Sequence, residues 1–122
     1  MANLTTLELK AIVPSKDFEL SKQFYHDLGF TVEWANDGLA YIRHGQSKFL
    51  LQKYYVKEFA ENLMMHLLVE DVDAWWEQVN KQNIASKYGV RASPPEQQRW
   101  GIRDFVLFDP TGVLWRIGQT TE

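Results

Sequence analysis

One order of predicted elements, a strand, a helix and then three strands, occurs twice along this chain of 122 residues. In each half, a run of apolar residues is followed by an acidic residue suited to cap a helix, Asp17 in the first half and Asp71 in the second. A sheet that is covered by helix on one face leaves its other face bare. Two such modules can therefore pair so that the bare faces form a cup, which is a shape suited to a ligand.

The apolar spacing and the turn residues predict where these elements begin and end. The first module should contain a strand over residues 7–13, a helix that is capped by Asp17 or Ser15 and runs to about Leu28, and strands over residues 30–35, 39–44 and 47–53. The second should contain a strand over residues 64–69, a helix from Asp71 to about Lys81, a short strand near residues 86–91, and a hairpin of residues 102–108 and 113–118. Residues 54–62 are charged and irregular, which indicates a link with at most a helical turn.

The closing hairpin is the most apolar segment, and its strands are joined by Asp109-Pro110-Thr111-Gly112. Proline pre-sets φ in such a turn and glycine supplies a position with positive φ. The chain is expected to form one α+β domain, 1–122, with module 1 at about 5–54, a linker at about 54–63 and module 2 at about 64–120.

Composition excludes several classes of function. The absence of cysteine rules out disulfides, thiolate chemistry and a Cys-ligated zinc. A net charge of −3 without a basic tract argues against nucleic acid, although it would tolerate a cationic partner. Neither a signal peptide nor an apolar run of membrane-spanning length is present, so we expect a cytoplasmic protein with no membrane partner.

Several segments match one family in order along nearly the whole chain. They are Pro14-Ser15-Lys16-Asp17-Phe18, Phe24-Tyr25, Leu28-Gly29-Phe30, Trp100-Gly101 and the hairpin from Asp109-Pro110-Thr111-Gly112 to Gln119. In these segments the chain resembles the bleomycin resistance proteins, which belong to the vicinal oxygen chelate superfamily together with glyoxalase I and the extradiol dioxygenases. The resemblance implies paired β-α-β-β-β modules in an open, cup-shaped sheet with helices on the outer face. It also implies a homodimer whose interface contributes to the ligand grooves.

Enzymes of that superfamily bind a divalent metal through His, Gln or Glu on the first and last strands of a module. By resemblance, the corresponding positions in this chain hold Lys10, Met64 and Arg116. Lysine and arginine have no lone pair available at neutral pH, and methionine is a soft ligand unsuited to hard cations. We therefore expect no metal and no other cofactor, the alternative being a divalent metal that His66 helps to bind from the same strand face as Met64.

The candidate ligand-binding residues are four aromatic side chains on or beside predicted strands, together with one arginine: Trp34, Tyr41, Phe49, Trp100 and Arg116. Flat rings can stack on a planar ligand, and they can equally pack in the core. If Arg116 faces the cup, strand alternation turns Trp115 toward the helix. Arg116 could hold a ligand carboxylate or stack on an aromatic ligand, or it could pair with a carboxylate such as Glu8, Glu33 or Asp104.

No nucleophile elbow, phosphate loop or paired-carboxylate motif is found, so we assign no catalytic residue. The leading hypothesis is metal-independent binding and sequestration of a small, partly aromatic and in some cases cationic ligand, such as a bleomycin-type antibiotic, in grooves at a dimer interface. The alternatives are a metal-dependent lyase or dioxygenase with atypical ligands, and a binding module for another metabolite.

Overall fold

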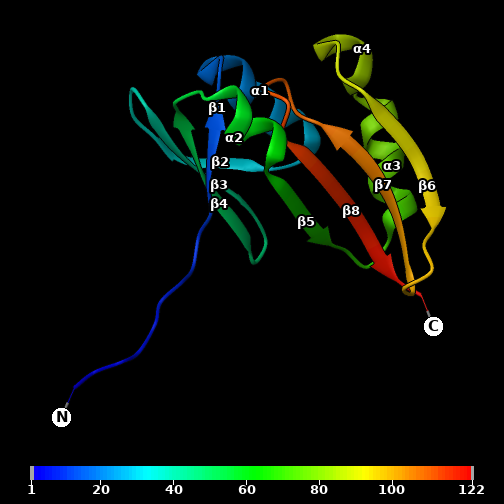
Figure 1. The fold of residues 1–122 in the computed structure, drawn as a ribbon, viewed down its shortest axis with the longest axis horizontal. Helices are drawn as coiled ribbons and strands as arrows, with labels where there is room; N and C mark the ends of the chain where they lie inside the picture. The colour runs from blue at the N-terminus through cyan, green and yellow to red at the C-terminus, as the bar shows by residue number, and fades with distance from the viewer. Residues whose placement is uncertain (1, 122) are drawn as a thin grey trace.

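The computed structural model describes residues 2–121 and contains both modules (Figure 1). The first consists of β1 (Ile12–Ser15), α1 (Phe18–Leu28), β2 (Thr31–Ala35), β3 (Leu39–His44) and β4 (Ser47–Lys53). The link contains α2 (Lys57–Asn62). The second module consists of β5 (Met64–Leu68), α3 (Val72–Lys81), α4 (Ile84–Tyr88), β6 (Ala92–Gln97), β7 (Ile102–Phe108) and β8 (Leu114–Thr120). The predicted α+β class and the repeated β-α-β-β-β order are confirmed.

Each module forms its own four-stranded sheet, with the strand order β1-β4-β3-β2 in the first and β5-β8-β7-β6 in the second. In both sheets the first strand runs parallel to the last strand of its module, and the other neighbours are antiparallel. Helix α1 packs against β2 and β4, and α3 packs against β6, β7 and β8. Because each sheet is covered on one face, the opposite face is free to carry a site.

The two long helices begin at the predicted caps. The Asp17 carboxylate accepts a hydrogen bond from the Leu20 N–H at 3.1 Å, and the Asp71 carboxylate accepts one from the Ala74 N–H at 3.1 Å. Gly29 ends α1 with a φ of 122°, a conformation that side chains with a Cβ rarely adopt. No helix within residues 2–121 is long and apolar enough to cross a bilayer.

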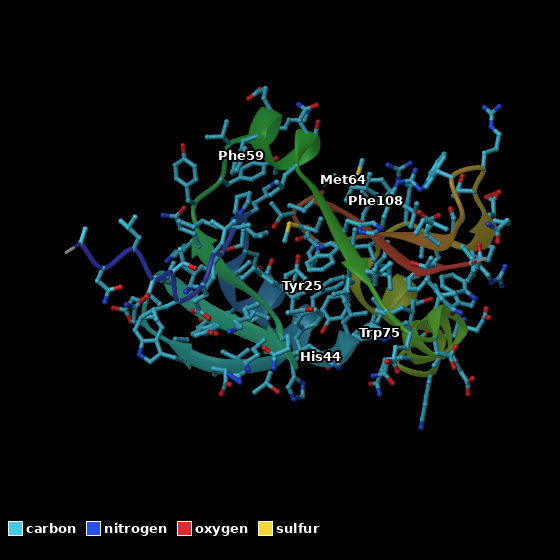
Figure 2. All side chains as sticks on the ribbon, turned by 90° about the horizontal axis from the view of Figure 1, so that it is seen from below. Tyr25, His44, Phe59, Met64, Trp75 and Phe108 are labelled. Carbon is cyan, nitrogen blue, oxygen red and sulfur yellow. The ribbon has the colours of Figure 1, made fainter. Side chains whose placement is uncertain are left out.

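An aromatic cluster joins the two modules in the core. Tyr25 of α1 lies between them (Figure 2), with ring centroids 5.0 Å from Phe49 and 5.5 Å from Trp115. Its hydroxyl donates to the buried Asp109 carboxylate and accepts from the indole N–H of Trp115 at 2.9 Å. One oxygen of Asp109 also accepts the backbone N–H groups of residues 111–113. The carboxylate therefore both closes the β7–β8 turn and attaches that turn to α1.

The strand predicted over residues 7–13 is wrong over most of its length, because β1 begins only at Ile12. Leu7 and Leu9 are 92% and 97% exposed, and the start of the chain extends away from both sheets (Figure 1). The apolar alternation is present, but within one chain no neighbouring strand covers it. Pro14, the residue after the predicted strand, lies inside β1. An edge strand permits this because one row of its N–H groups is unpaired.

The strand predicted near residues 86–91 is also wrong. Residues 84–88 form α4, which follows Asn83 in a left-handed conformation and buries Ile84. The actual strand is β6, and it contains Pro94 and Pro95. Its pairing with β7 shifts between Ser93 and Glu96, and it lies at the sheet edge. A sheet can accommodate residues without an N–H donor at an irregular edge. The prediction excluded the proline pair from a strand and was wrong because β6 lies at such an edge.

Candidate functional site

The exposed face of the first sheet carries two of the predicted aromatic residues. Trp34 of β2 is directly opposite Tyr41 of β3 in the antiparallel register, so both side chains lie on the same face. Trp34 is 51% exposed. The Tyr41 hydroxyl donates to the Glu8 carboxylate at 3.1 and 3.2 Å. These two rings form an accessible aromatic surface with a polar group at one side.

Arg116 lies on the exposed face of the second sheet. Its register partner on β5 is His66, and its guanidinium donates to Asp104 of β7 at 3.1 Å. Of the three acidic partners considered from the sequence, the structure therefore selects Asp104. That carboxylate is only 3% exposed, and its other oxygen accepts from the Gln98 side-chain amide at 3.0 Å. The positive charge of Arg116 on this face is therefore balanced by the Asp104 carboxylate.

Two other predicted residues lie elsewhere. Phe49 is buried in the core cluster, where it contacts Trp115 and Phe30. Trp100 is 66% exposed in the loop between β6 and β7. Trp115 is buried on the helix side of β8, as the alternation around Arg116 predicted. Trp34, Trp100 and Arg116 therefore come from three different parts of the chain, which are the first sheet, the β6–β7 loop and the second sheet.

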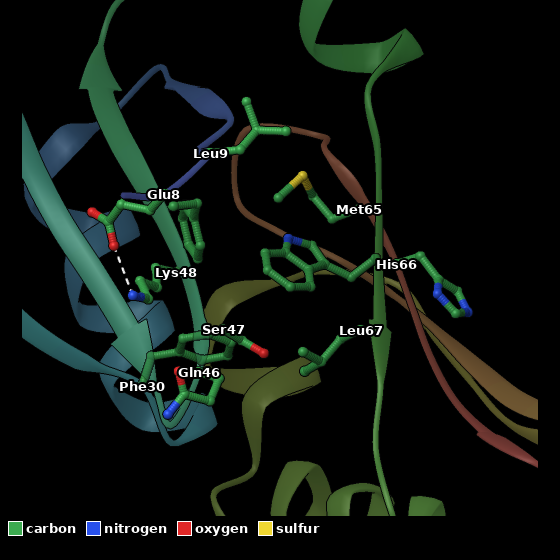
Figure 3. A pocket seen from close by; sticks show the side chains of 11 residues that line it. Glu8, Leu9, Phe30, Gln46, Ser47, Lys48, Met65, His66 and Leu67 are labelled. Atoms are coloured by element: carbon green, nitrogen blue, oxygen red, sulfur yellow. Dashed lines mark hydrogen bonds and ion pairs between the residues drawn. The ribbon is translucent and has the colours of Figure 1, made fainter. Parts of the chain in front are cut away.

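A cavity of about 440 Å³ opens between the two modules (Figure 3). Its lining comes from the N-terminal arm, the β3–β4 turn with the start of β4, the strand β5, and the aromatic core: Glu8, Leu9, Phe30, Gln46, Ser47, Lys48, Phe49, Met65, His66, Leu67 and Trp115. Figure 3 shows the His66 ring projecting to the opposite side of β5 from the Met65 side chain, as strand alternation requires. The cavity thus has an aromatic floor and a polar wall, a combination typical of small-molecule sites.

The polar wall contains a cluster that the sequence reasoning missed. The Glu8 carboxylate accepts from Lys48 Nζ at 2.7 Å, from Lys10 Nζ and from the Tyr41 hydroxyl. The hydrogen bonds from Lys10 and then Lys48 lower the pKa of Glu8 to about 2. The sequence contains one signal for this cluster: Glu8 and Lys10 alternate with Leu7 and Leu9, so in an extended segment their side chains point to the same side. Lys48, however, is 38 positions beyond Lys10, and nothing in the sequence joins the two.

The superfamily's metal can be tested against the residues at the expected positions. Lys10 donates to Glu8, Arg116 donates to Asp104, and Met64 offers only a thioether. His66 is level with Arg116 on the neighbouring strand, so a cation there would face the guanidinium. Within residues 2–121 no three His, Cys, Asp or Glu side chains are grouped so that they could hold a metal ion. This donor set does not fit a divalent metal.

Comparison with known proteins finds a matching family model and a similar resistance protein. A family model described as the Glyoxalase/Bleomycin resistance protein/Dioxygenase superfamily matches residues 8–117. A bleomycin resistance protein from Klebsiella pneumoniae is 29% identical over 114 residues, which is 88% of this chain and 87% of that protein.

Two solved structures show how widely the fold is shared. The crystal structure of a bleomycin-binding protein complexed with bleomycin superposes with a TM-score of 0.79 at 26% identity, covering 94% of this chain and 99% of that one. A lactoylglutathione lyase from Agrobacterium tumefaciens superposes with a TM-score of 0.70 at 13% identity, covering 94% of each chain, which shows the fold alone. With nearly its whole length matched by the family model and both modules in place, the chain belongs to the Glyoxalase/Bleomycin resistance protein/Dioxygenase superfamily.

Proposed function

We propose that this protein is a cytoplasmic homodimer that binds and sequesters a small, partly aromatic molecule of the bleomycin type, without a metal and without making or breaking a bond. The ligand would lie in grooves at the dimer interface, between the exposed sheet face of one protomer and that of its partner. Support for the ligand class comes from the bleomycin-bound relative and from the Klebsiella resistance protein, each matched over most of its length.

The observation that carries the binding role is the Arg116–Asp104 ion pair. The resemblance implies that a catalytic member has a metal-binding glutamate at the position of Arg116. In this chain that position holds the cationic Arg116, and the nearby buried Asp104 carboxylate already accepts hydrogen bonds from Arg116 and from Gln98. Without a Lewis acid or another catalytic constellation, the exposed aromatic rings are the features left to act on a ligand.

Exposed apolar side chains support the dimer. Met64 and Leu68 of β5 are 55% and 58% exposed, and Phe59 of α2 projects on the same side of the molecule as Met64 (Figure 2). Several large apolar groups in neighbouring elements are typical of a protein interface. A partner covering them would also bring together site residues that are dispersed within one chain.

Titration of bleomycin against the purified protein tests the proposal. We expect a dissociation constant on the order of 1 μM or tighter that is the same in chelator-treated and metal-loaded samples, since Lys10, Met64 and Arg116 do not suit a divalent metal. Trp fluorescence would follow binding, and light scattering of the same samples should give a particle of two chains. Binding or turnover only after addition of Ni²⁺, Zn²⁺, Mn²⁺ or Fe²⁺ would contradict the proposal.

Replacing Trp34 or Trp100 by Ala should weaken bleomycin binding by about 1–3 kcal/mol if these rings anchor the ligand. Both rings are more than half exposed, so stability to denaturant should change by less than about 0.5 kcal/mol. Leu20→Ala, on the helix-covered side of the first module, serves as a control. Unchanged affinity in both Trp variants would show that neither ring belongs to the groove.

A metal-dependent lyase or dioxygenase is the second candidate, and it would require His66 to bind the metal next to the Arg116 guanidinium on the neighbouring strand. In that case His66→Ala should abolish any metal-induced change in Trp fluorescence. A binding module for another metabolite is the third candidate. It would bind aromatic ligands in calorimetry and give no protection of cells against bleomycin.

A further inference from the structure

Three hydrogen-bond donors converge on one carboxylate at the wall of the cavity between the modules. Lys48 Nζ lies 2.7 Å from Glu8, the Tyr41 hydroxyl lies 3.1 Å from it, and Lys10 donates to its other oxygen. The Lys10 ammonium also lies 5.3 Å from the centroid of the Tyr41 ring. Two ammonium groups and a phenol around one anion form a charge-assisted oxyanion site.

The carboxylate in this site is supplied by a weakly attached segment. Glu8 belongs to residues 2–11, which form no helix or strand, and Leu7 and Leu9 on either side of it are almost fully exposed. Within residues 2–121, the hydrogen bonds that connect this arm to the rest of the chain are those of Glu8 and one from the Leu50 N–H to the Ala11 carbonyl. Because the segment that carries Glu8 is weakly attached, the effective concentration of this carboxylate at the three donors is limited, and an external anion can replace it.

The surroundings of the three donors show what else such a ligand must contain. Apolar side chains line the same cavity: Leu9 follows Glu8 on the arm, and Met65 and Leu67 lie on β5 across the cavity from the Glu8–Lys48 pair (Figure 3). Beside the same donors, Trp34 stands exposed next to Tyr41 on the sheet face. An oxyanion attached to a flat apolar ring would fit both parts of the surroundings.

We propose that Lys48 and Tyr41, which the first sheet holds in place, form an oxyanion subsite for an aromatic ligand that carries a carboxylate or phosphate group. In this proposal Glu8 occupies the subsite as an internal competitor until the ligand displaces it. This inference rests on the proposed binding function and adds a chemical class to it. Lys10 belongs to the same arm as Glu8, so displacement of Glu8 leaves the Lys48 ammonium and the Tyr41 hydroxyl facing the ligand. This part of the groove therefore selects for an anion even though the whole chain has a net charge of −3.

Calorimetric titration of the full-length protein with matched naphthalene probes tests the subsite. The probes are 1-naphthoate, 1-naphthyl phosphate, the neutral 1-naphthylmethanol and the cationic 1-naphthylmethylamine, with inorganic phosphate as the ring-free anion. We expect the two aromatic anions to bind about threefold to tenfold more tightly than the alcohol. Comparison of carboxylate with phosphate identifies which oxyanion the subsite prefers.

Two variants should shift the anion affinities in opposite directions. Glu8→Gln removes the charge of the competitor and should tighten binding of 1-naphthoate about threefold to tenfold, whereas Lys48→Gln should weaken it by a similar factor. Tyr41→Phe should weaken it about threefold and provides a second test that leaves the charge unchanged. Affinity for 1-naphthylmethanol should stay constant in all three variants.

Matched controls exclude a general charge effect. Glu77→Gln and Lys81→Gln change the net charge equally at exposed positions of α3, and both should leave every affinity unchanged. The proposal is wrong if Glu8→Gln fails to tighten anion binding, or if the cationic probe binds best and requires Glu8. If bleomycin binds while the anions ignore these variants, the subsite fails and sequestration stands. If the anions respond and bleomycin does not bind, the subsite stands and the proposed antibiotic is wrong.

Discussion

Asp109→Ala should destabilise the protein by about 3–5 kcal/mol, because one buried carboxylate serves several donors. Its oxygens accept the Tyr25 hydroxyl and the N–H groups of Thr111, Gly112 and Val113. The variant leaves these donors inside the protein without an acceptor and detaches α1 from the β7–β8 turn. Chemical denaturation would measure the loss, which corresponds to a fall in Tm on the order of 10 °C or more.

Asp37→Ala provides the matched control for this substitution. Asp37 is exposed, and within residues 2–121 its side chain makes no hydrogen bond or ion pair, so stability should change by less than about 0.5 kcal/mol. Asp109→Asn should be milder than Asp109→Ala, since its amide oxygen can still accept the three backbone N–H groups. A free energy of unfolding for Asp109→Ala equal to that of the wild type would contradict the assigned role.

The same residue makes stability depend on pH in a direction that can be tested. Burial raises the pKa of Asp109 above its usual value near 3.8, against the lowering effect of its hydrogen bonds. The folded state thus binds the proton more tightly than the unfolded state. The resulting stability is fully present below the unfolded pKa and is lost as pH rises through the folded pKa. Asp109→Asn should lack this component when its unfolding is compared with that of the wild type across the acidic range.

Gly118→Ala should cost about 1–3 kcal/mol, because β7 and β8 approach each other too closely at this position for a methyl group. An added Cβ would lie 2.8 Å from Ile102 Cγ2 and 3.0 Å from Asp104 Cβ. The isoleucine methyl can rotate away, but Asp104 Cβ moves only with the backbone of β7. The strands must therefore separate, and the Asp104–Arg116 ion pair is disturbed with them.

The contribution of each contact to the Gly118→Ala effect can be separated by further variants. Ile102→Ala in the Gly118→Ala background should recover part of the lost stability, and a double-mutant cycle would measure that coupling. Gly38→Ala is the control, since its added Cβ would meet Lys53 Cβ only at an ordinary 3.9 Å. Equal stabilities of Gly118→Ala and Gly38→Ala would show that β7 accommodates the methyl without moving.

The ends of helices and strands were predicted well where neighbouring residues decide them. The caps Asp17 and Asp71, the end of the first helix at Leu28 and the Asp-Pro-Thr-Gly turn each depend on a few neighbouring residues, so they are visible in the sequence. Errors arose where a distant partner decides the outcome. Residues 7–11 alternate like a strand but have no neighbouring strand within one chain, and Pro94 and Pro95 are tolerated because β6 lies at an edge.

The candidate site likewise has features that single residues decide and features that only the tertiary structure decides. The prediction that no metal binds came from the residue types at the positions that the family resemblance assigns to metal ligands, Lys10, Met64 and Arg116, because ligand chemistry belongs to the side chain itself. It stays a prediction. The selection of Asp104 as the partner of Arg116, the burial of Phe49, and the meeting of Glu8 with Lys48 and Tyr41 depend on how the strands align and twist. Side-chain periodicity assigns a face to each residue, whereas only the packed sheets bring residues from different strands within hydrogen-bonding distance.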